Sequence, residues 1–157
     1  MTVHPIPPVF NESSRILILG SFPSVKSRDD GFFYAHPQNR FWKVIAATFN
    51  EELPIGTKEK HKFLLDHGIA LWDVIASCDI KGSADSSITD VVPNDLSPIL
   101  NTSPIEKIFV NGKTAQRYYN TYLRKNVGQD AIYLPSTSPA NASWSLERLI
   151  EAWRIIK

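Results

Sequence analysis

The stretch ILILGSFPSVKSRDDGFFYAHPQNRFW, residues 16–42, decides the fold. Its first four residues form an apolar, partly β-branched run of the kind found in buried strands. Gly20 and Pro23 end that run, because neither residue favours continuation of a strand ladder. A loop of aromatic and polar residues follows, and we expect a helix from Arg40. In open α/β sheets, a strand that leads through such a loop into a helix commonly contributes to a ligand site.

Strands and helices alternate along the rest of the chain. We expect strands at residues 15–19, 69–72, 107–110 and 131–134, and helices at 40–50, 57–67, 95–102, 113–124 and 145–156. The polar segment 78–93 reads as a loop, and residues 1–14 as an extended N-terminal arm. This order predicts an α/β fold, a three-layer αβα sandwich with a central, mostly parallel four-stranded sheet. Residues 1–157 are expected to form one domain.

Composition excludes several classes of protein. The formal net charge of +1 gives no general attraction to a polyanion, so any such partner would need a local patch. Cys78 is the only cysteine, which excludes an intrachain disulfide and fits a reducing compartment. No signal peptide or membrane-spanning run is apparent, so we expect a cytoplasmic protein without a membrane partner. We also expect it to be a monomer.

Unusual residues follow three of the predicted strands. The strand ends read GSFPS at residues 20–24, Asn111-Gly112, and PSTSPANA at residues 135–142. The carboxyl ends of parallel strands meet at one edge of a sheet, so these segments should lie together. We therefore expect the functional site at this edge.

The residues at this edge favour binding chemistry over metal or cofactor chemistry. The sequence has no phosphate-binding loop, dinucleotide fingerprint, nucleophile elbow or zinc-protease motif. Its four histidines lack metal-ligand spacing, so we expect neither a metal nor a cofactor. The available groups can stack a planar ligand on Phe33 or Tyr34, hydrogen-bond its edge through Asn39, and hold phosphates with hydroxyl and backbone N–H groups. This combination indicates a nucleotide drawn out of its strand.

Three motifs together resemble the uracil-DNA glycosylase superfamily. They are GSFPS, FYAHPQNRFW at residues 33–42, and LPSTSPANA at residues 134–142. The sequence is most similar to the hypoxanthine-type (deoxyinosine) branch, and its HPxNRFW segment is similar to the mismatch-specific uracil/thymine branch. The resemblance covers nearly the whole chain. It implies an αβα sandwich, a cleft at the carboxyl ends of the strands, base flipping, and hydrolysis of the N-glycosidic bond.

The resemblance also implies roles for particular residues. Phe22 stands where mismatch-specific relatives have a water-positioning Asn, so the catalytic role is expected to fall to Asn39. Tyr34 matches the base-stacking position, and the 135–142 loop would enter the duplex and grip its backbone. The expected base-binding residues are Gly20, Ser21, Phe22, Pro23, Ser24, Phe33, Tyr34 and His36. The expected DNA-binding residues are Asn111, Gly112, Lys113, Ser136, Thr137, Ser138, Pro139, Ala140 and Asn141.

Structural roles compete with these functional ones. Phe22 is equally well explained as a core residue or a pocket wall. Asn39 can cap the following helix, and His36 more commonly braces a loop than acts in catalysis. Phe41 and Trp42 are expected in the core.

The predicted function is that of a monofunctional DNA glycosylase that removes hypoxanthine, uracil or xanthine and leaves an abasic site. Two alternatives belong to other classes. One is a module that binds damaged nucleotides without cleaving them, and the other is a small-molecule hydrolase with Ser21 or Ser136 as its nucleophile.

Overall fold

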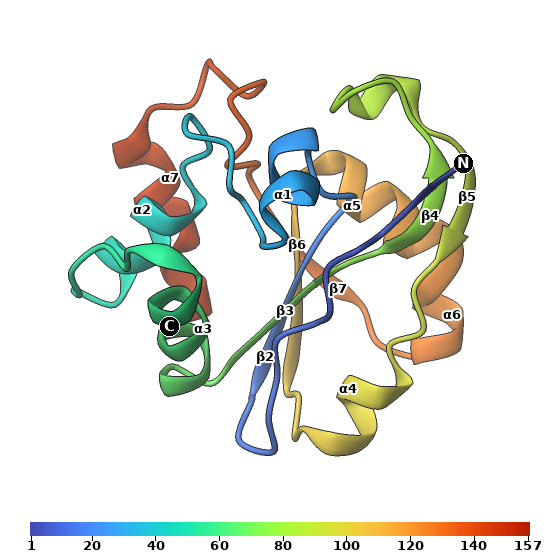
Figure 1. Ribbon diagram of the computed structural model, residues 1–157. Helices are drawn as coiled ribbons and strands as arrows, with labels where there is room; N and C mark the ends of the chain where they lie inside the picture. Colours follow the sequence, from blue (N-terminus) through green and yellow to red (C-terminus); the bar gives the residue numbers. More distant parts are fainter.

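A four-stranded parallel sheet forms the centre of the protein. The computed structural model describes all 157 residues (Figure 1). The central strands are β2 (Ile16–Gly20), β3 (Ile69–Asp73), β6 (Lys107–Asn111) and β7 (Ala131–Leu134). They lie in the order β3-β2-β6-β7, and every neighbouring pair is parallel. The predicted sheet is therefore confirmed, with the carboxyl ends of all four strands at one edge.

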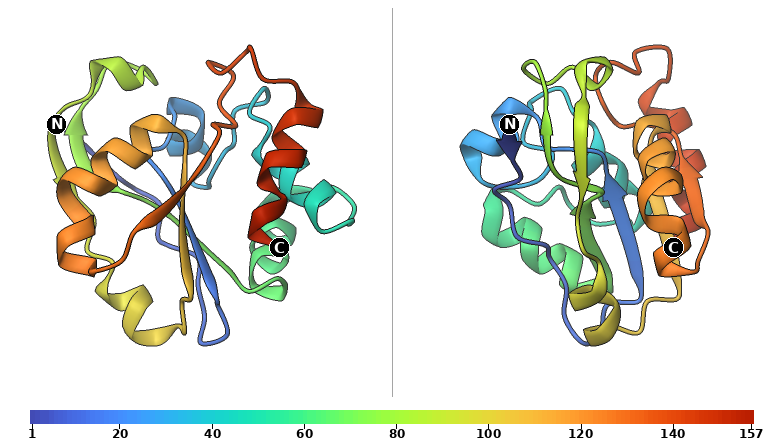
Figure 2. Two further views of the ribbon diagram at one scale, coloured as in Figure 1. Left: turned by 180° about the vertical axis from the view of Figure 1, so that it is seen from behind. Right: turned by 90° about the vertical axis from the view of Figure 1, so that its right-hand side faces the viewer.

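Helices cover both faces of this sheet (Figures 1 and 2). One face packs against α2 (Phe41–Thr48), α3 (Gly56–Asp66) and α7 (Leu146–Trp153), and the chain ends in a 3₁₀ turn at Arg154–Ile156. The other face packs against α4 (Ser97–Thr102) and α5 (Lys113–Tyr118). The expected helix at 113–124 is interrupted, because a π-helical turn at Tyr119–Leu123 separates α5 from α6 (Arg124–Val127).

The prediction of a loop at residues 78–93 was wrong. This segment contributes to a second, antiparallel sheet with the order β1-β4-β5, made of β1 (Thr2–Val3), β4 (Ile75–Asp79) and β5 (Thr89–Pro93). A 3₁₀ turn at Asp85–Ser87 lies between β4 and β5. Cys78 and Ile88 are buried against the central sheet, while polar residues occupy the outer positions. Too few apolar residues alternate here for the sequence to reveal strands, which form through pairing with distant segments.

The short helix α1 (Val25–Asp30) was also missed by the sequence analysis. Ser24 caps its first turn by accepting a hydrogen bond from the Ser27 N–H at 3.1 Å. Gly31 ends it in the left-handed conformation, with φ of 75°. The helix is too short to produce apolar periodicity, although its Ser cap and Gly stop are present in the sequence.

The N-terminal arm packs as a cover along the central sheet. Ile6 and Val9 are buried, and the backbone of Val9 pairs with Leu71 of the edge strand β3. The arm therefore protects the open edge of that strand and brings residues 1–6 close to the carboxyl end of β3. No helix of the protein has the length and apolar character needed to cross a membrane.

Candidate active site

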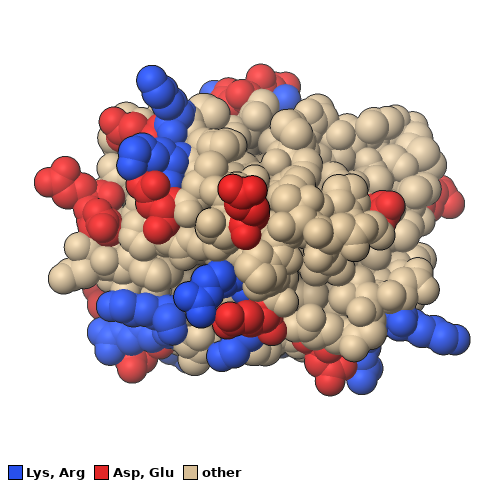
Figure 3. All heavy atoms as spheres, turned by 90° about the horizontal axis from the view of Figure 1, so that it is seen from below, with Lys and Arg blue, Asp and Glu red and all other residues tan.

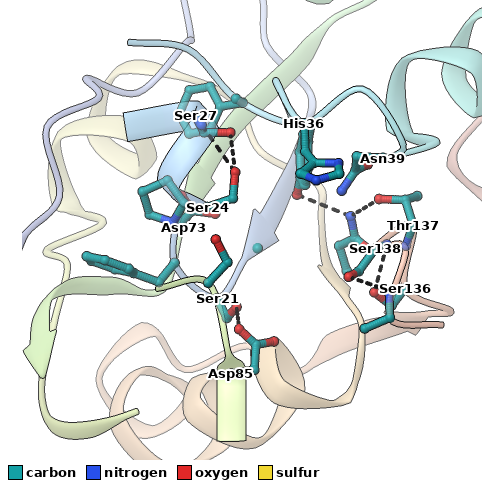
Figure 4. A pocket seen from close by; sticks show the side chains of 18 of the residues that line it. Ser21, Ser24, Ser27, His36, Asn39, Asp73, Asp85, Ser136, Thr137 and Ser138 are labelled. Atoms are coloured by element: carbon teal, nitrogen blue, oxygen red, sulfur yellow. Dashed lines mark hydrogen bonds between the residues drawn. The ribbon is translucent and has the colours of Figure 1, made fainter. Parts of the chain in front are cut away.

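A cavity lies at the carboxyl edge of the central sheet (Figure 4). Three of its residues terminate neighbouring strands: Gly20 in β2, Asp73 in β3 and Asn111 in β6. The segment after β7 closes one side. The volume of the cavity is about 320 Å³, which lies within the range of small-ligand sites.

Most of the predicted site residues line this cavity. All eight expected base-binding residues and Asn39 do so, together with Asn111 and five residues of the loop after β7, namely Ser136, Thr137, Ser138, Pro139 and Ala140. The other expected DNA-binding residues, Gly112, Lys113 and Asn141, line an adjoining cavity of about 780 Å³. Phe22 fills both of its predicted roles, because it is 8% exposed in the core and also forms a wall of the first cavity.

Four lining residues were not among the predicted site residues: Ser27, Asp73, Ser83 and Asp85. Three of these residues lie in elements that were not predicted from the sequence: Ser27 lies in α1, and Ser83 and Asp85 lie between β4 and β5. These segments hold each other, because Arg28 donates to the Gly82 carbonyl at 2.5 Å and the Val25 N–H donates to Ser83 Oγ at 2.9 Å. Asp73 directly follows the apolar run at residues 69–72, so its place at the carboxyl edge is predictable from the sequence.

The Asn39 side chain contacts the start of α2 and also lines the cavity. Its Oδ1 accepts a hydrogen bond from the Phe41 N–H at 2.9 Å, which supports the first turn of α2. The side-chain N–H₂ makes no hydrogen bond within the protein. His36 lies beside Asn39 (Figure 4), and its Nδ1 accepts from the Gln38 N–H at 3.1 Å. The loop thus holds Asn39 in place and leaves two amide protons for a ligand or water.

Tyr34 is held as a flat, neutral ring. It stacks on Phe41, with ring centroids 4.1 Å apart and an interplanar angle of 15°. Its backbone has a positive φ of 53°, which is uncommon for a non-glycine residue. Its side chain lines the cavity. Burial, followed by the negative charge of Asp73, raises the pKa of the phenol well above its usual range, while a hydrogen bond from Asn111 acts in the opposite direction. The ring therefore keeps its proton at any working pH.

Asn111 connects two walls of the cavity. Its Nδ2 donates to the Tyr34 hydroxyl at 3.2 Å and to Thr137 Oγ1 at 3.0 Å, and its Oδ1 accepts from the Thr137 N–H at 3.1 Å. Thr137 is fully buried. These contacts fix the loop after β7 against the end of β6, so Thr137 acts as a brace between more exposed residues.

Gly20 is required by close packing at the floor of the cavity. A Cβ atom at this position would lie 2.4 Å from Asp73 Oδ1 and 2.9 Å from the Tyr34 hydroxyl oxygen. Gly20→Ala is therefore expected to lower the free energy of unfolding by about 1–3 kcal/mol, the usual range for overpacking. Urea unfolding measures this loss. A variant as stable as the wild type would show that both side chains move aside without cost.

The cavity is acidic rather than basic. Asp73 and Asp85 line it, and no lysine or arginine does. Partial burial raises the pKa of Asp85, against the effect of hydrogen bonds with Thr114 and Ser21. On the opposite face, at the amino ends of the strands, acidic and basic side chains are interspersed among wide uncharged areas (Figure 3). Lys113 and Arg117, which line the adjoining cavity, bring positive charge near the site.

The serines of the cavity lack the partners of a hydrolytic nucleophile. Ser21 Oγ lies 3.4 Å from Asp85 Oδ1, and Ser136 Oγ accepts from the Ser138 N–H at 3.1 Å. Neither serine has a hydrogen bond to a histidine, which a serine nucleophile would need as its base. The geometry therefore does not favour the small-molecule hydrolase.

Comparison with known proteins agrees with this geometry. The curated relatives include a hypoxanthine DNA glycosylase of Methanosarcina acetivorans, 36% identical over 152 residues, which cover 96% of this chain and 94% of the relative. A hypoxanthine DNA glycosylase of Methanosarcina barkeri is 32% identical over 137 residues, covering 86% of this chain and 85% of the relative.

A solved structure extends the similarity to three dimensions. The solution NMR structure of a candidate uracil DNA glycosylase from Methanosarcina acetivorans superimposes with a TM-score of 0.81 at 32% identity, and the match covers 99% of each chain. The family model of the Uracil DNA glycosylase superfamily matches residues 7–157. With this match over nearly its whole length, the chain belongs to the uracil DNA glycosylase superfamily.

Proposed function

We propose that this protein is a monofunctional DNA glycosylase that flips a deaminated base out of DNA and hydrolyses its N-glycosidic bond. The observation that carries the proposal is the free amide of Asn39 in a cavity that also contains the flat ring of Tyr34. The names of the two curated relatives favour hypoxanthine as a substrate. Uracil and xanthine carry the same deaminated edge, a carbonyl beside a ring N–H, and are further candidates.

The chemistry follows from the groups around the cavity. Loss of the base generates an oxocarbenium-like sugar and negative charge on the departing base. Asn39 is too weak a base to remove a proton, but its amide can orient the attacking water or bind the base. The backbone N–H groups of Phe22 and Ser24 have no acceptor within the protein and can stabilise charge on the leaving base. Because the cavity contains no lysine to form a Schiff base, the product is an abasic site in an intact strand.

The adjoining cavity is suited to the DNA backbone. It shares Asn111, Ser136 and Ser138 with the base cavity and adds Lys113 and Arg117. These hydroxyl, amide and cationic groups are the usual ligands of phosphate oxygens. We propose that the strand leaves the base cavity along this side, next to the loop after β7.

A cleavage assay tests the proposed function. Single- and double-stranded oligonucleotides that contain deoxyinosine, deoxyuridine, deoxyxanthosine or a G·T mismatch are incubated with the protein, and half of each sample is then treated with alkali. We expect breaks only after alkali treatment, with deoxyinosine among the substrates. If none of the oligonucleotides breaks, the proposed activity is wrong, and tight binding without breakage would favour the damage-binding module.

Tyr34→Ala is expected to weaken binding of the flipped base. Stacking on an aromatic ring contributes about 1–3 kcal/mol per base, so the affinity for a deoxyinosine duplex should fall by roughly 5- to 100-fold. Fluorescence anisotropy under non-cleaving conditions, with a matched undamaged duplex, measures this change. Tyr34→Phe is the control, because it keeps the ring and its stack on Phe41. Equal affinities for all three proteins would leave Tyr34 with a packing role only.

We further propose that the protein acts as a monomer in the cytoplasm. The residues assigned above to base binding, catalysis and phosphate binding belong to one chain, so the proposed chemistry invokes no second copy. Light scattering of the protein with and without a damaged duplex measures the oligomeric state, and a dimer on DNA would contradict this part of the proposal.

A further inference from the structure

A buried His–Asp pair lies at the floor of the base cavity and has no part in the proposed chemistry. His4 Nε2 lies 2.7 Å from Asp73 Oδ2, and the two side chains are only 3% and 5% exposed. His4 comes from the N-terminal arm, whereas Asp73 ends the edge strand β3. The arm, which runs along the edge strand β3, therefore contacts one oxygen of a carboxylate that lines the cavity.

The hydrogen bonds of His4 define which nitrogen of its imidazole ring carries the proton. Its Nδ1 accepts a hydrogen bond from the Ile6 N–H at 3.1 Å, so that nitrogen carries no proton. The proton of the imidazole is then on Nε2 and is donated to Asp73 Oδ2. Edge contacts with Phe22 and Trp72, at 5.9 Å and 6.1 Å between ring centroids, hold the imidazole in this orientation.

The second oxygen of Asp73 remains available as an acceptor. Oδ1 accepts no hydrogen bond from the protein, and it approaches Gly20 so closely that a Cβ atom there would lie 2.4 Å away. The strand end is also fixed, because Asn94 Nδ2 donates to the Asp73 carbonyl at 2.9 Å. In the same cavity, the backbone N–H groups of Ser21 and Phe22 have no acceptor within the protein. This end of the cavity thus has a rigid acceptor, Asp73 Oδ1, near the unpaired backbone N–H groups of Ser21 and Phe22.

We propose that Asp73 Oδ1 accepts the ring N–H of the flipped base and that His4 is the positioning residue that holds Asp73 for this contact. The proposal rests on the proposed function and names how its substrate is selected. Deamination converts the ring nitrogen next to the altered carbon from an acceptor, as in adenine, into an N–H donor, as in hypoxanthine. A carboxylate accepts only, so it pairs with hypoxanthine N1–H and repels the lone pair of adenine N1. The new carbonyl beside that N–H can accept from the unpaired backbone N–H groups.

The test compares two substrates that differ at this one position. Single-turnover cleavage rates and duplex affinities are measured with 2′-deoxyinosine and with 1-methyl-2′-deoxyinosine, which lacks the ring N–H. The wild type should prefer deoxyinosine by roughly 10- to 100-fold, the range for a hydrogen bond to a charged group. Asp73→Asn can keep the contact with His4 through its oxygen and then places an N–H₂ group at the free position. This variant should lose most of its activity on deoxyinosine and most of the preference.

Two further variants separate positioning from general loosening of the arm. His4→Ala should reduce the preference for deoxyinosine by about 3- to 10-fold, because the freed carboxylate keeps its acceptor but not its fixed orientation. Asp79→Asn removes another anchor of the arm, an ion pair at 3.3 Å with the N-terminal ammonium group, at a residue that lines neither cavity. It should retain the full preference. Thermal unfolding of each variant verifies that the fold is intact.

The outcomes distinguish this inference from the proposed function. If the wild type cleaves deoxyinosine and Asp73→Asn keeps its preference over the methylated base, the role of Asp73 is wrong while the glycosylase activity stands. An equal loss on both bases would likewise overturn it, because the effect would not depend on the ring N–H. If the wild type cleaves neither base, the proposed function fails, and the ratio of duplex affinities in wild type and Asp73→Asn decides the role of Asp73.

Discussion

Asn39→Ala is expected to slow base removal by roughly 100- to 1,000-fold, the usual loss when one preorganised amide donor is removed from a catalytic site. The two ends of the side-chain amide have different roles. Its Oδ1 accepts a hydrogen bond from the Phe41 N–H, whereas its N–H₂ group remains free for the substrate or water. Loss of the contact between Asn39 Oδ1 and the Phe41 N–H should cost only about 1 kcal/mol of stability. Single-turnover kinetics with a deoxyinosine duplex and thermal unfolding of the same samples measure the two effects separately.

Two matched variants sharpen this expectation. Asn39→Asp keeps the oxygen that accepts from the Phe41 N–H but removes both amide protons, so it should retain the stability of the wild type and still lose the activity. Gln38→Ala changes the exposed neighbouring amide and should cleave at the wild-type rate. A near-normal rate for Asn39→Ala would assign the catalytic role to another residue and leave Asn39 with only its structural contact to the Phe41 N–H.

The central sheet could be predicted because its signal is local. Residues 16–19, 69–72 and 108–110 are short apolar runs followed by Gly, Asp or Asn, and each lies in a strand of the parallel sheet. Since such strands share one carboxyl edge, the sequence alone predicts that GSFPS, Asn111 and the 135–142 loop lie together. The cavity contains all three segments.

The remaining parts of the site depend on long-range contacts that leave little trace in the sequence. His4 reaches Asp73 across 69 positions of the chain, and nothing around His4 distinguishes it from a solvated histidine. The pairing of β4 with β5 carries Ser83 and Asp85 to the cavity, yet their segment is as polar as a loop. The sequence motif HPQNRFW did include Arg40, but spacing alone assigned it to the first turn of a helix and gave it no partner.

Arg40 holds the two loops of the site together. Its guanidinium donates to the carbonyls of Ser138 at 3.3 Å and Asn141 at 3.0 Å, and also to the carbonyl of Trp144. Its backbone N–H donates to the Thr137 carbonyl at 3.1 Å. The residue directly after Asn39 thus fixes the shape of the loop proposed to contact DNA.

Arg40→Met is therefore expected to lower both stability and DNA affinity. The thioether chain fills much of the same space but donates nothing, so three carbonyls lose a charged donor, at a cost of about 3 kcal/mol in the free energy of unfolding. A loosened loop must also be ordered on binding, so the affinity for a duplex with an abasic site should fall by roughly 10-fold or more. Urea unfolding and fluorescence anisotropy measure the two losses.

Loss of positive charge is the competing explanation for a weaker complex with DNA, and two variants distinguish it from loss of the brace. Arg40→Lys keeps the charge but cannot reproduce the planar fork of donors, so it should behave like Arg40→Met if bracing matters. Lys43→Met removes an exposed cation from α2, the helix that begins directly after Arg40, and should preserve stability. If Arg40→Lys restores the affinity, or Lys43→Met loses as much as Arg40→Met, then Arg40 acts through its charge on DNA. The Arg40 side chain connects the Asn39 loop to the 135–142 loop. If this connection positions Asn39, Arg40→Lys should also slow the cleavage step itself, measured at a protein concentration that saturates the DNA.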